Sequence, residues 1–147
     1  MITVRSILKE KGEEIYSVNQ DSPIRDAIRL MAEKNIGAVM AMDENDQLVG
    51  IFSERDYAQL NSKKRSNDRT PVKEVMSTKI YFVSPKETAE LCMALMTDRH
   101  IRHLPVVENG ILIGVISIGD VVRSVINDQT STIDSLENYI MGRGYGR

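Results

Sequence analysis

Two segments of the chain carry apolar residues at helical spacing, 65 positions apart. The first set is Ile24, Ala27, Ile28 and Met31, and the second is Ala89, Cys92, Met93 and Met96. A spacing of i, i+3, i+4, i+7 places each set on one face of a helix. Helix-start signals precede both sets, Ser22-Pro23 in one and Ser84-Pro85-Lys86-Glu87 in the other. We therefore expect helices over residues 23–34 and 86–99.

An apolar segment follows each expected helix and is predicted to form a strand. These segments, 36–42 and 101–107, are again 65 positions apart. In the second copy, Asn109-Gly110 separates two apolar runs, and both residues tolerate the positive φ that a type I′ hairpin turn requires. In the first copy we expect a longer turn from Asp43 to Gln47.

The repeat continues through a shared motif. Residues 50–56 match residues 114–120 at Gly, Ser and Asp, so each copy carries Gly, two apolar residues, Ser, two further residues and Asp. A second helix is expected to start near Ser53 in one copy and near Ser117 in the other. Short leading strands near 15–18 and 80–83 complete a β-α-β-β-α unit. The sequence thus predicts an α+β fold of two tandem units.

The predicted organisation along the chain has four parts. The first repeat spans 1–60, a linker 61–71, the second repeat 72–127, and a C-terminal helix with a flexible tail 128–147. The linker has no apolar residues and ends at Pro71, which is typical of a solvated connection. Ile133, Leu136 and Ile140 lie at helical spacing, so the tail is expected to contain a docking helix.

Composition narrows the class of protein. The 147 residues are 41% hydrophobic and 27% charged, which is typical of a soluble globular protein. With 19 Lys and Arg against 21 Asp and Glu, the chain has no overall basic field, which argues against nucleic acid as a partner. No apolar run is long enough to span a membrane. We expect the protein to be cytoplasmic, because the chain has one cysteine and no signal-like N-terminus. This cysteine, Cys92, lies on an apolar helix face and is expected to be a buried structural thiol.

Residues 4–127 closely resemble a tandem pair of cystathionine-β-synthase (CBS) domains, an assembly called a Bateman module. Leu104-Pro105-Val106-Val107 followed by the 114–120 motif carries the resemblance most fully, while the first copy has Met40 where the second has Pro105. The resemblance implies that the repeats pack with pseudo-two-fold symmetry and leave two clefts for adenosine-containing ligands. It also implies a homodimer that senses energy state or regulates another protein, including thioredoxin-type partners in some members.

Two aspartates are the candidate ribose ligands. Asp56 and Asp120 lie three residues after Ser53 and Ser117, each at a helix start, where a carboxylate can accept hydrogen bonds from both hydroxyls of a ribose and the serine can add a third contact. Free N–H groups at the helix start also favour an anion. The alternative is a capping box, in which the serine and the acid serve only the helix. Both roles are compatible, and the fuller match of the second copy to the family favours Asp120 for the ribose.

The resemblance assigns further residues to a nucleotide. Adenine would lie against Ile15, Met40, Ile80, Leu104 and Pro105, although any of these can instead belong to the core. Phosphates would meet Arg99, His100, Arg102 and His103 in the second copy, with Arg55 compensating in the first. The alternative for these cations is a solvated positive surface. No metal site is expected, because His100 and His103 precede a strand rather than share a helix face.

No catalytic motif is recognisable, so an enzyme is the weakest hypothesis. The leading hypothesis is a regulatory module that requires no cofactor, binds AMP, ADP or ATP, and responds by a population shift. NAD and S-adenosylmethionine rank behind these nucleotides, and the regulated protein is not identified. The rival hypothesis is a constitutive homodimeric scaffold with vacant clefts. Binding of single-stranded nucleic acid is disfavoured by the acidic balance and the few aromatic residues.

Overall fold

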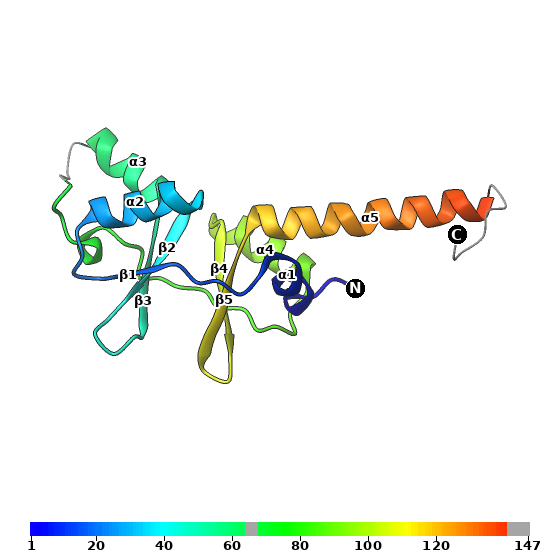
Figure 1. Ribbon diagram of the computed structural model, residues 1–147, viewed down its shortest axis with the longest axis horizontal. Helices are drawn as coiled ribbons and strands as arrows, with labels where there is room; N and C mark the ends of the chain where they lie inside the picture. The colour runs from blue at the N-terminus through cyan, green and yellow to red at the C-terminus, as the bar shows by residue number, and fades with distance from the viewer. Residues whose placement is uncertain (64–67, 141–147) are drawn as a thin grey trace. The chain divides into compact units, whose positions relative to one another are not determined.

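The computed structural model describes residues 1–63 and 68–140, with only the helical backbone described for 61–63 and 130–140. The chain divides into two compact units (Figure 1). Glu14–Tyr81 form one, here called the first-copy unit, and Met1–Glu13 together with Phe82–Arg147 form the other, the second-copy unit. Residues at the N-terminus therefore belong in space with the second copy.

The first-copy unit is a three-stranded sheet with helices. Its elements are β1 (Ser17–Asn19), α2 (Ile24–Lys34), β2 (Ala38–Met42), β3 (Leu48–Ser53), α3 (Glu54–Lys63) and the 3-10 turn η1 (Val72–Glu74). The strand order is β1-β2-β3, with β1 parallel and β3 antiparallel to β2. The core consists of Ile24, Ala27, Met31, Val39, Ala41, Phe52 and Val72. The predicted β-α-β-β-α unit is confirmed for this copy, because the helical stripe packs on the sheet as its spacing indicated.

The second-copy unit has a two-stranded sheet. Its elements are α1 (Val4–Lys11), α4 (Ala89–Arg99), β4 (His103–Glu108), β5 (Ile111–Ser117) and α5 (Ile118–Ile140). Strands β4 and β5 are antiparallel, and Asn109 and Gly110 between them both have positive φ, at 53° and 77°. The predicted hairpin is therefore confirmed.

Two boundaries predicted for the second copy are wrong. Residues 80–83 do not form a strand: only Val83 makes an isolated bridge to β4, because Ser84 and Pro85 turn the chain away directly after it. Helix α4 begins at Ala89 rather than at 86. The side chain of Thr88, and not that of Ser84, caps the helix by accepting a hydrogen bond from the Leu91 N–H at 3.1 Å.

The two ends of the predicted linker are ordered. Asn61–Lys63 continue α3, and residues 64–67 lie outside the described part of the chain. Beyond them, the carbonyl of Thr70 accepts a hydrogen bond from the Ile24 N–H at 2.8 Å. This bond supplies an acceptor to the first turn of α2, whose N-cap Pro23 offers no side-chain acceptor. The C-terminal helix is also not separate, since α5 runs for 23 residues without a break at 128 (Figure 1).

The segment that precedes each copy in sequence bonds to the helix start of the other copy. The Val4 N–H donates to the Glu87 carbonyl, just before α4, at 2.8 Å. Correspondingly, the Val72 N–H donates to the Ser22 carbonyl, just before α2, at 2.8 Å. The repeat boundaries expected along the sequence stay a prediction. In the folded chain, however, α1 belongs to the second-copy unit, and η1 belongs to the first-copy unit.

The motif glycines make room for these incoming segments. A Cβ on Gly114 of β5 would lie 2.7 Å from Cδ2 of Leu8 in α1, and a Cβ on Gly50 of β3 would overlap the Met76 side chain that follows η1. Any larger residue would collide with an apolar side chain that covers the strand. The shared glycine thus lets the preceding segment pack directly on the sheet.

Candidate functional site

The first-copy motif forms a turn from β3 into α3. Asp56 Oδ2 accepts hydrogen bonds from the Ser53 N–H at 2.9 Å and from the Ser53 hydroxyl at 3.0 Å, while the Asp56 N–H donates to Ser53 Oγ at 3.2 Å. This reciprocal arrangement is a capping box, so the capping interpretation is confirmed. In the described part of the structure, no hydrogen bond or ion pair engages Oδ1 of Asp56, which leaves that oxygen able to accept from a ligand.

The second-copy motif repeats this geometry between β5 and α5. Asp120 Oδ2 accepts from the Ser117 N–H at 2.8 Å, and the Asp120 N–H donates to Ser117 Oγ at 3.1 Å. Each copy therefore presents one carboxylate at the N-terminus of a helix, where unpaired N–H groups favour negative charge.

Strand pairing brings part of the predicted phosphate cluster to the second-copy turn. His103 of β4 lies opposite Ser117 of β5, and the Arg102 carbonyl accepts from the Ile118 N–H at 2.9 Å. Arg99 and His100 end α4 and are exposed. In the first copy, Gly37 and Ala38 stand where the second copy has Arg102 and His103, and Arg55 in the first turn of α3 is exposed. The second-copy turn therefore has a cation and a histidine at positions where the first-copy turn has neither, and a role in binding phosphate stays a prediction for all five residues.

Burial lowers the pKa of His103 to about 4, with the charges of Lys11 and Arg102 acting in the same direction against the opposing charge of Asp120. His103 is therefore neutral at pH 7 and can offer a phosphate a hydrogen bond but no charge. Between pH 6.5 and 4 the unfolded chain binds a proton that the folded chain does not, so the free energy of unfolding falls as the pH is lowered.

We expect the His103 ring resonances to stay constant from pH 8 to 5 in an NMR titration, because the imidazole remains neutral. His103→Gln should weaken the dependence of urea unfolding on pH between 6.5 and 4. His100→Asn is the matched control, since His100 is exposed and Asn tolerates its φ of 54°. Titration of His103 near pH 6.5 would contradict the assignment of a half-buried, neutral imidazole.

The predicted adenine-contacting residues differ in exposure. Met40 is 1% exposed, Leu104 is 0% exposed, and Pro105 is also buried. Ile15 and Ile80 are partly exposed, and both belong to the first-copy unit. Met40, Leu104 and Pro105 therefore contribute to tightly packed parts of the chain, and a role in binding adenine stays a prediction for all five.

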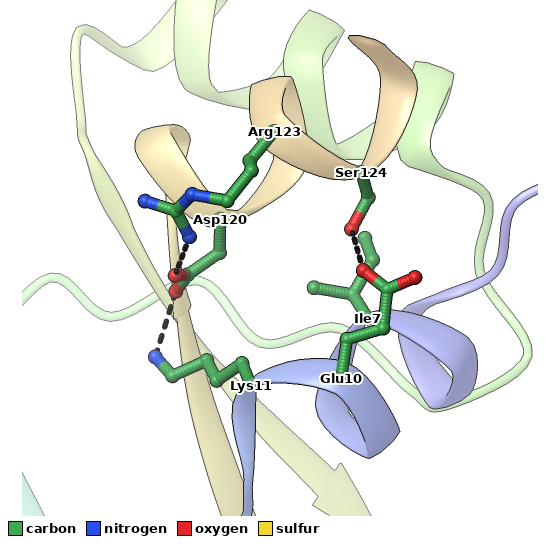
Figure 2. Close-up of a pocket in the computed structure, with 6 residues that line it drawn as sticks. All are labelled: Ile7, Glu10, Lys11, Asp120, Arg123 and Ser124. Atoms are coloured by element: carbon green, nitrogen blue, oxygen red, sulfur yellow. Dashed lines mark hydrogen bonds and ion pairs between the residues drawn. The ribbon is translucent and has the colours of Figure 1, made fainter. Parts of the chain in front are cut away.

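Sequence reasoning missed Lys11, the last residue of α1. Its ammonium lies 2.7 Å from Asp120 Oδ2, and Nη1 of Arg123 lies 3.4 Å from Asp120 Oδ1 (Figure 2). Burial alone would raise the pKa of Asp120, but hydrogen bonds from Lys11 and Ser117 and the charge of Lys11 hold that pKa below its ordinary value. The available signal was the spacing of Val4, Ile7 and Leu8, which indicates a short helix ending near Lys11.

Other candidate chemistry is limited. Cys92 is buried, as predicted, and burial with the nearby charge of Glu87 raises the pKa of its thiol to about 11, so it is protonated at neutral pH. Among the residues that the structure describes, no three His, Cys, Asp or Glu side chains are placed to share a metal ion. Nor does any helix in that part of the chain have the length and apolar character needed to cross a membrane.

The CBS domain model matches the chain twice, at residues 4–61 and 72–127. The chain belongs to the CBS-domain family. Both matched segments include a Ser-x-x-Asp turn, and together they cover most of the chain.

Similar proteins are also CBS-domain proteins. The mitochondrial CBS domain-containing protein CBSX3 of Arabidopsis thaliana is 35% identical over 97% of this chain and 73% of its own length. A structure of a protein with CBS domains from Burkholderia ambifaria is 48% identical, has a TM-score of 0.81, and is matched over 86% of this chain and 96% of that chain. The mixed fold of helices and two small sheets is thus that of CBS domain pairs.

Two more distant structures share the fold and contain ligands. The Pyrobaculum aerophilum CBS domain protein PAE2072, solved with AMP, is 24% identical with a TM-score of 0.72, over 81% of this chain and 89% of that chain. The CBS domain pair of MJ0100, solved with 5′-methylthioadenosine and S-adenosyl-L-methionine, is 20% identical with a TM-score of 0.77, over 87% of this chain and 98% of that chain. All three ligands contain adenosine or a close derivative of it.

Proposed function

We propose that this CBS-domain pair is a regulatory module that binds an adenine nucleotide of the AMP, ADP or ATP type through the ribose. The observation that carries the proposal is the Asp56 carboxylate, which is held at a helix start by Ser53. The Ser53 bonds occupy Oδ2 and fix the orientation of the carboxylate, so Oδ1 can accept from a ribose hydroxyl without rearrangement. The AMP bound by one structural relative supports the same ligand class.

Residues near the motif are proposed to complete recognition of the ligand. Arg55 and Arg102 are exposed cations beside the two Ser-x-x-Asp turns and can neutralise phosphate charge. Arg99 and His100, at the end of α4, are also proposed to interact with phosphate. His103 is proposed to donate a hydrogen bond as a neutral imidazole. For adenine, Ile15 and Ile80 offer the accessible apolar surface, while Met40, Leu104 and Pro105 would contribute only if the surrounding packing opens.

The proposed mechanism involves no reaction of the ligand. A nucleotide that binds one packing arrangement of the protein more tightly than another shifts the population towards it, by as much as its two affinities differ. A partner protein that recognises the favoured arrangement then responds to the nucleotide concentration. The partner is not identified, and the cytoplasm stays a prediction for the compartment because the similar Arabidopsis protein is named as mitochondrial.

Calorimetric titration of nucleotide-stripped protein with AMP, ADP, ATP, NAD and S-adenosylmethionine tests the proposal. We expect saturable binding of at least one of the first three, and a rise in thermal stability of about 2.7 kcal/mol at 100 times the dissociation constant. Absence of both heat and stabilisation with every ligand would reject nucleotide sensing and favour the constitutive scaffold.

We also propose that the protein is a homodimer, because the second-copy unit exposes apolar side chains on its helices. Leu91 of α4 is 46% exposed, and Val122 and Ile126 of α5 are 39% and 53% exposed. Val122 and Ile126 lie one helical turn apart and therefore share a face. Burial of this face against a second copy would remove the apolar surface from water.

Ile126→Glu is expected to shift a dimer towards the 16.6 kDa monomer in analytical ultracentrifugation, since burial of an unpaired carboxylate is unfavourable. Asn127→Glu is the matched control, because Asn127 is an adjacent, exposed polar residue of α5. If the wild-type protein sediments only as a monomer at micromolar concentration, the proposed homodimer is wrong.

A further inference from the structure

The carboxylates of the two Ser-x-x-Asp turns have different partners. Oδ2 of Asp56 accepts only from Ser53 among the described residues, and no described group engages its Oδ1. At Asp120, Oδ2 accepts from Lys11 at 2.7 Å in addition to Ser117, and Oδ1 faces Arg123 at 3.4 Å. Both oxygens of Asp120 therefore already meet a cation, as Figure 2 shows.

The position of Lys11 is determined by the packing of α1. Leu8 fills the space above Gly114 of β5, and Lys11 follows one turn later on the same helix. The Lys11 ammonium also donates to the Val115 carbonyl, so two protein acceptors hold it. A second contact lies beside it, since the Ser124 hydroxyl donates to Glu10 at 3.1 Å (Figure 2).

The pair between Lys11 and Asp120 is partly shielded from solvent. The side chains are 27% and 12% exposed, respectively. An ion pair on an open surface contributes little, because water and salt screen it. Here the screening is reduced, and a ligand that takes over Asp120 must leave the ammonium with one fewer partner.

The first copy has a lysine at the equivalent position that does not reach its aspartate. Lys79 follows Met76 by three residues, as Lys11 follows Leu8. Its ammonium instead lies 6.0 Å from the centroid of the Tyr81 ring. The reason is the length of the helical segment, which is eight residues in α1 but three in η1.

From this asymmetry we infer that Lys11 is a site-selecting residue: it competes with a ribose for Asp120, so that the first nucleotide binds through Asp56. The inference rests on the proposed function. A cis-diol placed at Asp120 must share or displace the Lys11 hydrogen bond, whereas a cis-diol at Asp56 meets an oxygen that no cation among the described residues engages. Lys11→Met should therefore raise the affinity of the second-copy site, because the aliphatic stem remains and the competing charge is lost.

Calorimetric titration with AMP tests the inference in a set of variants of the full chain. We expect Asp56→Asn to weaken binding strongly, and Asp56→Asn/Lys11→Met to recover at least tenfold in affinity through Asp120. Asp56→Asn/Lys79→Met is the matched control and should bind as weakly as Asp56→Asn alone. A carbon-detected NMR titration should also show a higher pKa for Asp120 in Lys11→Met than in the wild type, which verifies the ion pair independently of nucleotide.

Three outcomes overturn the inference while AMP binding itself is intact. The first is no recovery in Asp56→Asn/Lys11→Met, and the second is equal recovery with Lys79→Met. The third is weaker binding in Lys11→Met alone, which would make Lys11 a contact of the nucleotide rather than its competitor. If the wild-type protein binds none of the adenosine ligands tested, the proposed function fails and the inference fails with it.

Discussion

Asp56→Asn is expected to weaken AMP binding by about 10- to 100-fold. The substitution keeps the shape of the side chain and an oxygen that can accept from Ser53, so the turn into α3 should persist. It removes the negative charge that strengthens hydrogen bonds from a ribose. Hydrogen bonds to charged groups contribute about 1.5–3 kcal/mol, and each 1.4 kcal/mol corresponds to a factor of about ten in affinity.

Asp46→Asn is the control for this variant. Asp46 is an exposed residue of the same unit in the turn between β2 and β3, and Asn tolerates its φ of 58°. Calorimetry should give wild-type affinity for this control and weakened binding for Asp56→Asn, with both proteins unfolding at similar urea concentrations. Equal affinity in all three proteins would show that Asp56 only caps α3.

Leu8→Ala is expected to lower the free energy of unfolding by about 2–5 kcal/mol, as for other large-to-small substitutions in a packed core. Leu8 is 2% exposed and lies against Gly114, so its removal leaves a cavity between α1 and β5. Urea unfolding measures the change. Ile111→Ala serves as control, because Ile111 is 64% exposed and its truncation should cost less than about 0.5 kcal/mol.

The same contact predicts a coupling between two substitutions. Gly114→Ala alone should destabilise the protein by about 1 kcal/mol, because the added Cβ would lie 2.7 Å from Leu8 Cδ2. In the Leu8→Ala background the added methyl enters the vacated space, so the cost should vanish or change sign. Strictly additive effects would contradict the packing of α1 on β5.

Most helices and strands of the fold can be predicted from the internal repeat and from local sequence patterns. The stripe of Ile24, Ala27 and Met31 indicates one face of a helix, and that face is the one that packs on the sheet. The Asn109-Gly110 turn was equally clear, since few residue pairs accept positive φ twice. These features are local, and periodicity or turn chemistry within a few residues is sufficient to identify them.

The remaining features depend on contacts between segments distant in sequence. Residues 80–83 resemble the first leading strand in composition, but whether they form a ladder depends on the path of the chain after Val83. Helix α1 packs against residues more than a hundred positions away. The pairing of Lys11 with Asp120 follows from that packing. The spacing of Val4, Ile7 and Leu8 indicates the helix, but no local pattern indicates the strand on which it packs. Each aspartate follows a serine by three residues in the sequence, and the different partners of the two carboxylates are seen only in the folded chain.

We propose that Asp56 of this CBS-domain pair binds the cis-diol of an adenosine ligand. Recognition of the ribose hydroxyls is tested most directly by a pair of calorimetric titrations of the wild-type protein, one with AMP and one with 2′-deoxy-AMP. Loss of one hydroxyl removes a hydrogen bond to a charged acceptor, so 2′-deoxy-AMP should bind about 10- to 100-fold more weakly than AMP. Equal affinity for the two compounds would contradict recognition of the ribose by Asp56.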